Sequence, residues 1–289
     1  MSKMKSGDIA AELKRAAELV ANADALVIGA GAGMGIDSGL PDFRGDSGFW
    51  KAYPALAQAQ ISFIDIADPR AFEDTPLLAW GFYGHRLALY RDTVPHAGFQ
   101  ILRKWGERMR FGSQVFTSNV DGQFQKSGFQ ESQINECHGS IHHLQCMSGC
   151  QAGVWSAKEF FPVVDDKTCQ LVNQAPQCPA CKSLARPNIV MFGDWNWVDE
   201  RNLIQQNHET RWFELIKKNA AKVVILELGA GTAIPSVRHF SQRISREHHG
   251  PIVRINPGES EVRNDRDVSI ALGALDGLQR IDELLKTSS

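Results

Sequence analysis

The stretch LVIGAGAGMGIDSGLPDFRGDSGFW, residues 26–50, joins an apolar run to a glycine-rich turn and then to the group Asp42-Phe43-Arg44. The apolar run predicts a buried strand, and glycines after a strand let the backbone turn tightly and approach a phosphate closely. Taken alone, the turn fits a phosphate-binding loop and a plain strand-to-helix connection equally well. Pro41 disfavours a helix that runs straight on, unlike the usual dinucleotide-binding turn. The stretch therefore predicts an α/β fold and leaves the ligand open.

Short β-rich runs recur along the chain between segments with helical periodicity. This alternation predicts a Rossmann-like, mostly parallel sheet with helices on both faces. In such sheets a ligand lies beyond the carboxyl ends of the strands, and those ends are here polar or rich in glycine. The runs are residues 24–30, 113–119, 188–193, 222–231, 251–256 and 267–273.

Two segments interrupt this pattern. Residues 50–92 hold helix-like stretches rich in aromatic residues, and residues 141–185 hold two pairs of cysteines with little apolar periodicity. We expect a helical insertion and a metal-binding module that together form a smaller domain beside the sheet. The remaining segments, 1–49, 93–140 and 186–289, are expected to form the nucleotide-binding domain.

The composition indicates which kinds of binding partner and which cellular compartment to expect for this protein. The 289 residues are 43% hydrophobic, enough for a real core, and the net charge of -2 comes from mixed signs, so there is no basic field for nucleic acid or an anionic membrane. Residues 1–24 resemble an amphipathic helix without a secretory core, and no apolar run approaches the ~20 residues that span a bilayer. We expect a soluble, cytoplasmic protein whose partner is a small molecule or a protein segment.

The cysteines fit a metal site better than a disulfide framework. Cys146-x3-Cys150 and Cys178-x2-Cys181 supply four thiolates in two short loops. Four such ligands suit tetrahedral Zn²⁺ in a closed, structural site. Cys169 lies between the pairs and is an alternative ligand.

Several motifs together resemble those of the sirtuins, a family of NAD-dependent protein deacylases. Gly31-Ala32-Gly33 followed by Pro41-Asp42-Phe43-Arg44-Gly45 resembles the opening signature of that family. The resemblance extends over about residues 25–260 and implies NAD as co-substrate and acylated lysine in a protein or peptide as substrate. The other matching pieces, in family order, are TSNVDG at 117–122, His138-Gly139-Ser140, the cysteine pairs, FGD at 192–194, Gly231-Thr232 and RIN at 254–256.

The resemblance assigns catalytic roles to three residues. His138 is expected to be the general base, since an imidazole with a pKa near neutrality can take a proton from a ribose hydroxyl. Asn119 and Asp121 are expected at the nicotinamide pocket and the reactive ribose. Without the resemblance, His138 fits a structural histidine, and Asn119 and Asp121 fit a turn after a strand.

The NAD-binding residues that the resemblance implies lie mainly in turns after strands. Phe43 is expected to shield the reactive ribose carbon, and Arg44 to orient phosphate and ribose. The alternative places Phe43 in the core and pairs Asp42 with Arg44. The full expected set is Gly31, Ala32, Gly33, Asp42, Phe43, Arg44, Ser118, Gly231, Thr232 and Asn256.

Two further groups are expected to bind the substrate. Tyr83 and Arg86 share a helix face at i and i+3. In sirtuins that remove succinyl or other acidic acyl groups, such a pair reads the acyl carboxylate, whereas the alternative is a core aromatic beside a solvent salt bridge. The segment with Val190, Phe192 and Gly193 is expected to bind the extended peptide by strand addition.

We therefore expect a sirtuin-type lysine deacylase, acting as a deacetylase or also as a desuccinylase. Its products would be nicotinamide, O-acyl-ADP-ribose and free lysine. Gly35, Ser118 and Ala233 depart from the residues usual in sirtuins, and each removes a polar contact near the cofactor. These departures keep two alternatives open, an NAD hydrolase or ADP-ribosyltransferase and an NAD-binding module without activity.

Overall fold

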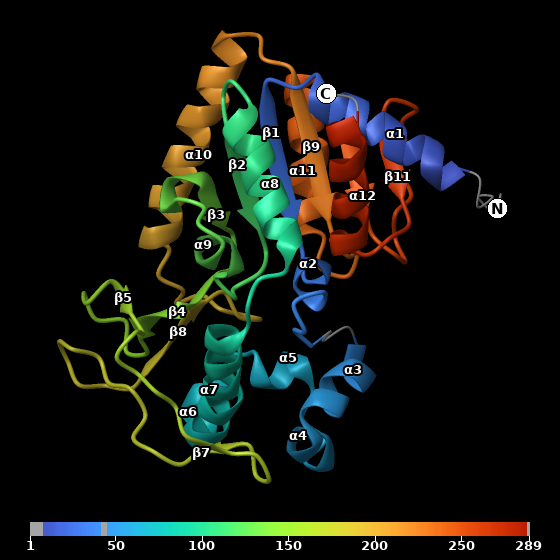
Figure 1. The fold of residues 1–289 in the computed structure, drawn as a ribbon. Helices are drawn as coiled ribbons and strands as arrows, with labels where there is room; N and C mark the ends of the chain where they lie inside the picture. The colour runs from blue at the N-terminus through green and yellow to red at the C-terminus, as the bar shows by residue number, and fades with distance from the viewer. Residues whose placement is uncertain (1–7, 42–44, 288–289) are drawn as a thin grey trace.

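A six-stranded parallel sheet forms the centre of the larger domain (Figure 1). The computed structural model describes residues 8–41 and 45–287. The strand order is β11-β10-β9-β1-β2-β3, and all five pairings are parallel. The expected Rossmann-like sheet is confirmed. Its strands are β1 (Ala25–Ala30), β2 (Ser113–Thr117), β3 (Ile134–Glu136), β9 (Val223–Leu228), β10 (Ile252–Ile255) and β11 (Val268–Ile270).

Helices cover both faces of this sheet, which is why its central strands are apolar throughout. Successive residues of β1 alternate between two core clusters, with Leu26 and Ile28 in one and Val27 in the other. The first cluster includes buried residues of α1 (Asp8–Ala21), α8 (Ala97–Arg108) and α12 (Ala274–Thr287). The second includes buried residues of α10 (Glu200–Lys218) and α11 (Ser236–His248).

The smaller domain combines the two interrupting segments. A single core cluster joins Trp80 and Tyr83 of the helical segment to Leu144 and Leu171 of the cysteine-bearing segment. The helices are α3 (Gly45–Ala52), α4 (Pro54–Gln58), α5 (Phe63–Ile66), α6 (Arg70–Asp74) and α7 (Pro76–Asp92). The strands are β4 (Gly139–Cys146), β5 (Val154–Ser156) and β8 (Ala185–Ile189), in antiparallel order β5-β4-β8, and the hairpin β6 (Val164–Asp165) and β7 (Gln170–Leu171).

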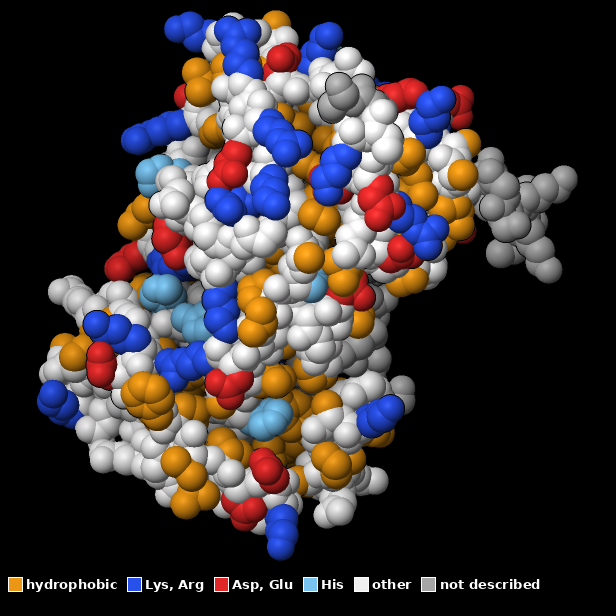
Figure 2. Space-filling view, in the orientation of Figure 1, with side chains coloured by type: hydrophobic (Ala, Val, Ile, Leu, Met, Phe, Trp, Pro, Cys, Tyr) orange, Lys and Arg blue, Asp and Glu red, His pale blue; other side chains and the backbone are white. Residues whose placement is uncertain are grey.

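Short helical elements follow β1 and β2. α2 (Gly33–Ile36) follows β1 and lies between the sheet and the smaller domain in Figure 1. α9 (Gln123–Lys126) and the 3-10 helix η1 (Glu131–Gln133) lie between β2 and β3. No helix in the described ranges is long and apolar enough to cross a membrane. Figure 2 shows positive and negative side chains interspersed over the visible face, in line with the mixed charge of the sequence.

One expected strand belongs to the other sheet. Of the run at 188–193, only residues 188 and 189 are in a strand, at the end of β8, which pairs antiparallel with β4 in the three-stranded sheet; residues 190–193 follow it outside any strand. Its apolar pattern is the same for either sheet, so periodicity alone could not decide between them. The boundaries of the two domains stay a prediction.

The parallel sheet has an edge strand that the pattern did not predict. β3 is only three residues long, and two of them, Asn135 and Glu136, are polar yet 1% exposed. Both are satisfied by α10, because Asn135 donates to Glu209 (3.0 Å) and Glu136 pairs with Arg201 (2.5 Å). Tertiary partners, which a sequence pattern does not display, make this strand possible.

Candidate active site

The glycine turn after β1 is held against the end of β9. Gly31 N donates to the Leu228 carbonyl (2.9 Å), and Gly33 N donates to the Gly229 carbonyl (3.0 Å). A Cβ on Gly31 would lie 2.8 Å from both Ala230 Cα and the Gly229 carbonyl oxygen, closer than real contacts allow. Gly31 and Gly33 are buried and Ala32 is exposed. The close approach explains the glycine at position 31, and the turn presents Ala32 to solvent.

The loop after β2 is tied to this turn. Asn119 Nδ2 donates to the Gly31 carbonyl (3.0 Å), and Thr117 Oγ1 donates to the Ala30 carbonyl (3.0 Å). Ser118 N donates to the same Ala30 carbonyl (3.1 Å). Asn119 thus fixes the glycine turn with its amide nitrogen, while its carbonyl oxygen has no hydrogen-bond partner among the described residues. The structure brings the predicted residues 31, 118 and 119 together.

Asp121 lies at the end of this loop with 8% of its surface exposed. One carboxylate oxygen accepts a hydrogen bond from Gln123 N (2.9 Å). Burial raises the pKa of Asp121 to about 6, the charge of Glu136 adds to the rise, and Arg86 opposes it. His142 Nε2 donates to the Asp121 carbonyl oxygen (2.9 Å) and holds the backbone at this point. Asp121 is therefore a buried carboxyl that can change protonation state close to physiological pH.

His138 lies between β3 and β4, and it is half-buried. Its Nε2 is 3.2 Å from Ser236 Oγ, at the start of α11. Burial lowers the pKa of His138, and hydrogen bonding to the Ser118 backbone raises it by a smaller amount. The net shift favours the neutral imidazole, which is the form that can act as a base.

The predicted peptide-binding segment adjoins His138. Val190 N donates to the His138 carbonyl (3.0 Å), and Phe192 N donates to the Ala67 carbonyl (2.8 Å). Val190 is 36% exposed, and Gly193 adopts a φ of 66°, in the left-handed region that favours glycine. The structure thus places Val190 beside the predicted base and ties Phe192 to the helical segment at Ala67.

The loops after β9 and β10 form one hydrogen-bonded unit. Asn256 is buried, and its Nδ2 donates to the Ala230 carbonyl (3.0 Å) while its Oδ1 accepts from Glu259 N (3.0 Å). Arg238 also donates to the Ala230 carbonyl (2.9 Å), a role that no sequence signal indicated. Gly231 is half-buried and Thr232 is exposed at the same end of the sheet. Asn256 therefore shapes the predicted cofactor loop, since both ends of its side chain are already bonded within the protein.

Tyr83 and Arg86 are both buried in α7, at 1% and 8% exposure. Arg86 Nη2 donates to the Tyr90 hydroxyl (2.7 Å), and its guanidinium carbon lies 5.2 Å from the ring centre of Phe82 and 5.9 Å from that of Tyr83. The alternative of a solvent-exposed salt bridge at Arg86 is wrong, because the side chain lies inside the small domain.

A cavity of about 330 Å³ opens near this cluster. Tyr53 and His85 line it and are joined by a hydrogen bond of 3.0 Å between the hydroxyl and Nδ1. Burial raises the pKa of Tyr53, and the charge of Arg86 opposes that rise, although Arg86 itself does not line the cavity. Ala52, Pro54, Ala55, Val164, Asp166 and Cys169 also line the cavity.

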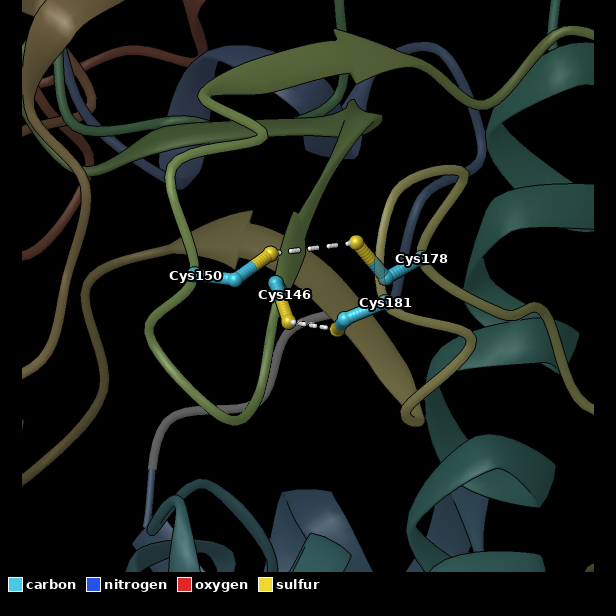
Figure 3. A group of neighbouring side chains, drawn as sticks. All are labelled: Cys146, Cys150, Cys178 and Cys181. Atoms are coloured by element: carbon cyan, nitrogen blue, oxygen red, sulfur yellow. Dashed lines mark hydrogen bonds between the residues drawn. The ribbon is translucent and has the colours of Figure 1, made fainter.

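The four predicted metal ligands come together in the small domain (Figure 3). Cys146 Sγ lies 3.4 Å from Cys181 Sγ, Cys150 Sγ lies 3.4 Å from Cys178 Sγ, and all four sulfur atoms lie within 4.8 Å of one another. Tetrahedral zinc with Zn–S bonds of about 2.3 Å requires sulfur atoms about 3.8 Å apart. The cluster therefore fits Zn²⁺ by donor type and by spacing. Cys169 is not part of it and lies instead in the turn between β6 and β7.

A sequence model of the Sir2 family matches residues 31–216. This chain is a member of the Sir2 family. The sirtuin is 30% identical to the NAD-dependent protein deacylase of Pyrococcus furiosus over 84% of this chain and 86% of that protein. It is 29% identical to the NAD-dependent protein deacylase of Thermococcus kodakarensis over 89% of this chain and 90% of that protein.

Solved structures of other sirtuins share the fold. A Sir2 homologue in complex with NAD superposes with a TM-score of 0.69 at 23% identity, covering 96% of this sirtuin and 95% of that chain. A mutant Sir2 homologue in complex with ADP-ribose superposes with a TM-score of 0.68 at 24% identity, covering 95% of this sirtuin and 96% of that chain. Asp42, Phe43 and Arg44, predicted to lie over the ribose, are outside the described residues.

Proposed function

We propose that this sirtuin is an NAD-dependent protein lysine deacylase that transfers the acyl group of lysine to ADP-ribose. The observation that carries the proposal is the position of His138. Its backbone carbonyl accepts from Val190 N in the predicted peptide segment, and its Nε2 lies 3.2 Å from Ser236 Oγ, at the start of the helix that follows the predicted cofactor loop at Gly231-Thr232. A base between the peptide segment and a nucleotide-binding loop suits acyl transfer between these two substrates. The two relatives from Pyrococcus furiosus and Thermococcus kodakarensis carry the name of this activity.

Each part of the site has a role in this reaction. The Gly31–Gly33 turn would receive the NAD pyrophosphate at the ends of the strands, where a nucleotide binds in this type of sheet. The carbonyl oxygen of Asn119 would accept from the carboxamide of nicotinamide. NAD would supply the ribose carbon to which the acyl oxygen bonds as the bond to nicotinamide breaks, and His138 Nε2 would take the proton of a ribose hydroxyl. Asp121 is buried and His138 half-buried, which would limit the access of water to that carbon.

Zinc would be held by Cys146, Cys150, Cys178 and Cys181, at the end of the small sheet. In this position it would stabilise the loops that carry the thiolates, which is the role of a closed site with four cysteines. A thiolate site of this kind also supports a reducing compartment, so we propose that the protein works in the cytoplasm.

The finer proposal concerns the acyl group. Arg86 is buried among aromatic rings, near a cavity whose wall includes Tyr53. A buried guanidinium offers charge-assisted, bidentate hydrogen bonds to a carboxylate that enters the same environment. We propose that the enzyme accepts succinyl-lysine as well as acetyl-lysine.

The zinc-loaded protein should be incubated with NAD and matched acetyl- and succinyl-lysine peptides. Mass spectrometry should detect nicotinamide, O-acyl-ADP-ribose and free lysine in equal amounts. The His138→Ala variant should lose peptide deacylation while it still binds NAD. Nicotinamide release without acyl-lysine would instead identify an NAD hydrolase, and NAD binding with no turnover of any peptide would contradict an enzymatic role.

A further inference from the structure

The hydroxyl of Ser236 is directed at the predicted base. Ser236 is the first residue of α11 and follows the N-cap Pro235, and a serine near a helix start can accept a hydrogen bond from a free backbone N–H of the helix. No hydrogen bond of this kind forms in the described structure. Its Oγ lies instead 3.2 Å from His138 Nε2, although the two residues are 98 positions apart in the sequence.

We propose that Ser236 is a positioning residue that holds His138 with Nε2 unprotonated and directed at the place of the ribose hydroxyl. The proposal rests on the deacylase function proposed above. Before NAD binds, the Ser236 O–H donates to the Nε2 lone pair. When NAD binds, the ribose hydroxyl replaces it, and the ring already has the orientation and tautomer that proton transfer needs.

The tautomer follows from the contact between the ring and Ser236. A neutral imidazole carries one proton, and a serine hydroxyl can donate to the ring nitrogen that lacks it. With Ser236 Oγ 3.2 Å from Nε2, a donating hydroxyl leaves the ring proton on Nδ1. Hydrogen bonding to the Ser118 backbone, the second partner of the ring, raises the pKa of His138 by less than burial lowers it.

The helix that carries Ser236 favours the same state. The N-terminus of an α-helix bears a partial positive charge, which disfavours an imidazolium beside it. α11 has 13 residues, and Ser236 lies in its first turn. Burial of His138 acts in the same direction. A neutral ring with a free Nε2 is the form that accepts a ribose proton.

The position of the hydroxyl is fixed by the core. Val237 is 2% exposed and Phe240 is 4% exposed, so the first turns of α11 cannot shift without disturbing the sheet. The Phe240 ring stacks on Phe116 of β2, with ring centres 4.0 Å apart and planes 6° apart. β2 leads directly to Ser118. Both partners of the His138 ring thus belong to one packed unit.

The proton transfer itself involves few atoms. The ribose O–H bond breaks, the proton forms a bond with Nε2, and the ribose oxygen keeps the electron pair with which it attacks the acyl carbon. The Ser236 hydroxyl neither gains nor loses a proton. Ser236 orients the ring before the reaction, whereas His138 is the base that accepts the proton.

The test compares Ser236→Ala with Ser236→Thr, which restores the hydroxyl. Nitrogen NMR of the labelled, ligand-free protein should show His138 protonated at Nδ1 in the wild type and in the threonine variant. The alanine variant should show a mixture of both tautomers. With acetyl-lysine peptide, the alanine variant should lose about tenfold in deacylation rate, because a mispositioned base costs part of its contribution.

Nicotinamide exchange separates positioning from damage to the fold. Exchange of labelled nicotinamide into NAD with acyl-peptide reports the step before the base acts, and it should stay within about twofold in both variants. An equal fall in exchange and deacylation, or an unchanged tautomer and rate in Ser236→Ala, would overturn the proposal. If the wild type shows no acyl-dependent turnover, the deacylase proposal fails, and the NMR tautomers alone decide the role of Ser236.

Discussion

Arg186 and Asp194 form a buried ion pair, with Nη2 and Oδ1 2.8 Å apart and side-chain exposures of 1% and 0%. The second carboxylate oxygen of Asp194 accepts from Met191 N (3.3 Å), and Arg186 also donates to the Ile189 carbonyl (3.2 Å). The pair therefore fixes the segment that runs from β8 into the predicted peptide-binding residues. It gives a structural reason for the aspartate in the FGD motif at 192–194.

Replacing Asp194 with Asn should destabilise the protein by roughly 3–5 kcal/mol, because it leaves a buried guanidinium without its counter-charge. The KM for acyl-peptide should rise as the segment loosens. Urea unfolding and peptide titration measure the two effects. Asp276→Asn is the matched control, since its pair with Arg280 is about half exposed and should change stability by less than about 1 kcal/mol. Equal effects of the two variants would contradict the role given to the pair.

Cysteine replacement should separate the metal site from the remaining thiols. Cys150→Ser should lower bound zinc well below one ion per chain and lower the melting temperature, since a closed site needs all four ligands. Cys169→Ala should keep the zinc, because Cys169 lies outside the cluster. Elemental analysis of the purified variants decides this. Full zinc content in Cys150→Ser would show that the cluster does not hold the ion.

Glu209 should make stability depend on pH. Burial raises the pKa of Glu209 from 4.5 to about 7, and one carboxylate oxygen has no hydrogen-bond partner among the described residues. The folded state therefore binds more protons than the unfolded state between these values, so this contribution is complete below pH 4.5 and is lost as the pH rises toward 7.

The variant Glu209→Gln carries no charge and isolates this effect. Its stability relative to the wild type should improve by roughly 2 kcal/mol between pH 5 and pH 8. Chemical unfolding of both proteins at several pH values measures the difference. A constant difference over this range would mean that Glu209 keeps an ordinary pKa in the folded protein.

Arg86→Met should weaken desuccinylation more than deacetylation, by at least about tenfold in the ratio of kcat/KM. The reason is that a charge-assisted bidentate pair contributes about 1.5–3 kcal/mol to a carboxylate and nothing to an acetyl group. Methionine keeps the apolar contacts with the surrounding rings. Equal losses for both peptides would indicate a packing defect in α7 and no reading of the acyl carboxylate.

An added methyl group should have different effects at Gly31 and at Gly231, two of the three glycines predicted to bind the cofactor. Gly31→Ala should destabilise the fold by about 1–3 kcal/mol, because its Cβ would overlap Ala230. A Cβ on Gly231 would meet no atom within 4 Å, so Gly231→Ala should keep the stability and weaken NAD binding by crowding the ligand. Thermal unfolding and NAD titration give the two readouts. Unchanged NAD affinity in Gly231→Ala would remove Gly231 from the binding site.

Sequence reasoning predicted the parts of this protein that depend on local pattern. The apolar runs at β1 and β9 were sufficient to predict buried strands, and the spacing of the cysteines was sufficient to predict the metal site. Burial and metal ligation both impose residue types at fixed intervals. β3 was missed because Asn135 and Glu136 are satisfied only by α10. Ser236 was missed for a similar reason, because its partner His138 lies far away in the sequence and a serine at a helix start has no pattern that indicates a distant partner.

The roles of Arg86 and Asn256 show a second limit. The sequence placed both near a ligand, but it did not show that both side chains are buried and already hydrogen-bonded within the protein. Asn256 uses its side chain to hold Ala230, and Arg86 lies among aromatic rings of its own helix. The position of these residues in motifs therefore predicted that they lie near a site, and it did not predict which groups they contact.

The antiparallel pair of β4 and β8 has the predicted base and peptide segment at one end and the cysteine loops at the other. β4 begins directly after His138 and finishes at Cys146, while β8 begins at Ala185 and finishes directly before Val190. All of the chain from 147 to 184 enters and leaves at the cysteine end. Insertions or exchanges there can alter which proteins the enzyme meets without changing the spacing between base and peptide segment, so target choice can evolve separately from the chemistry.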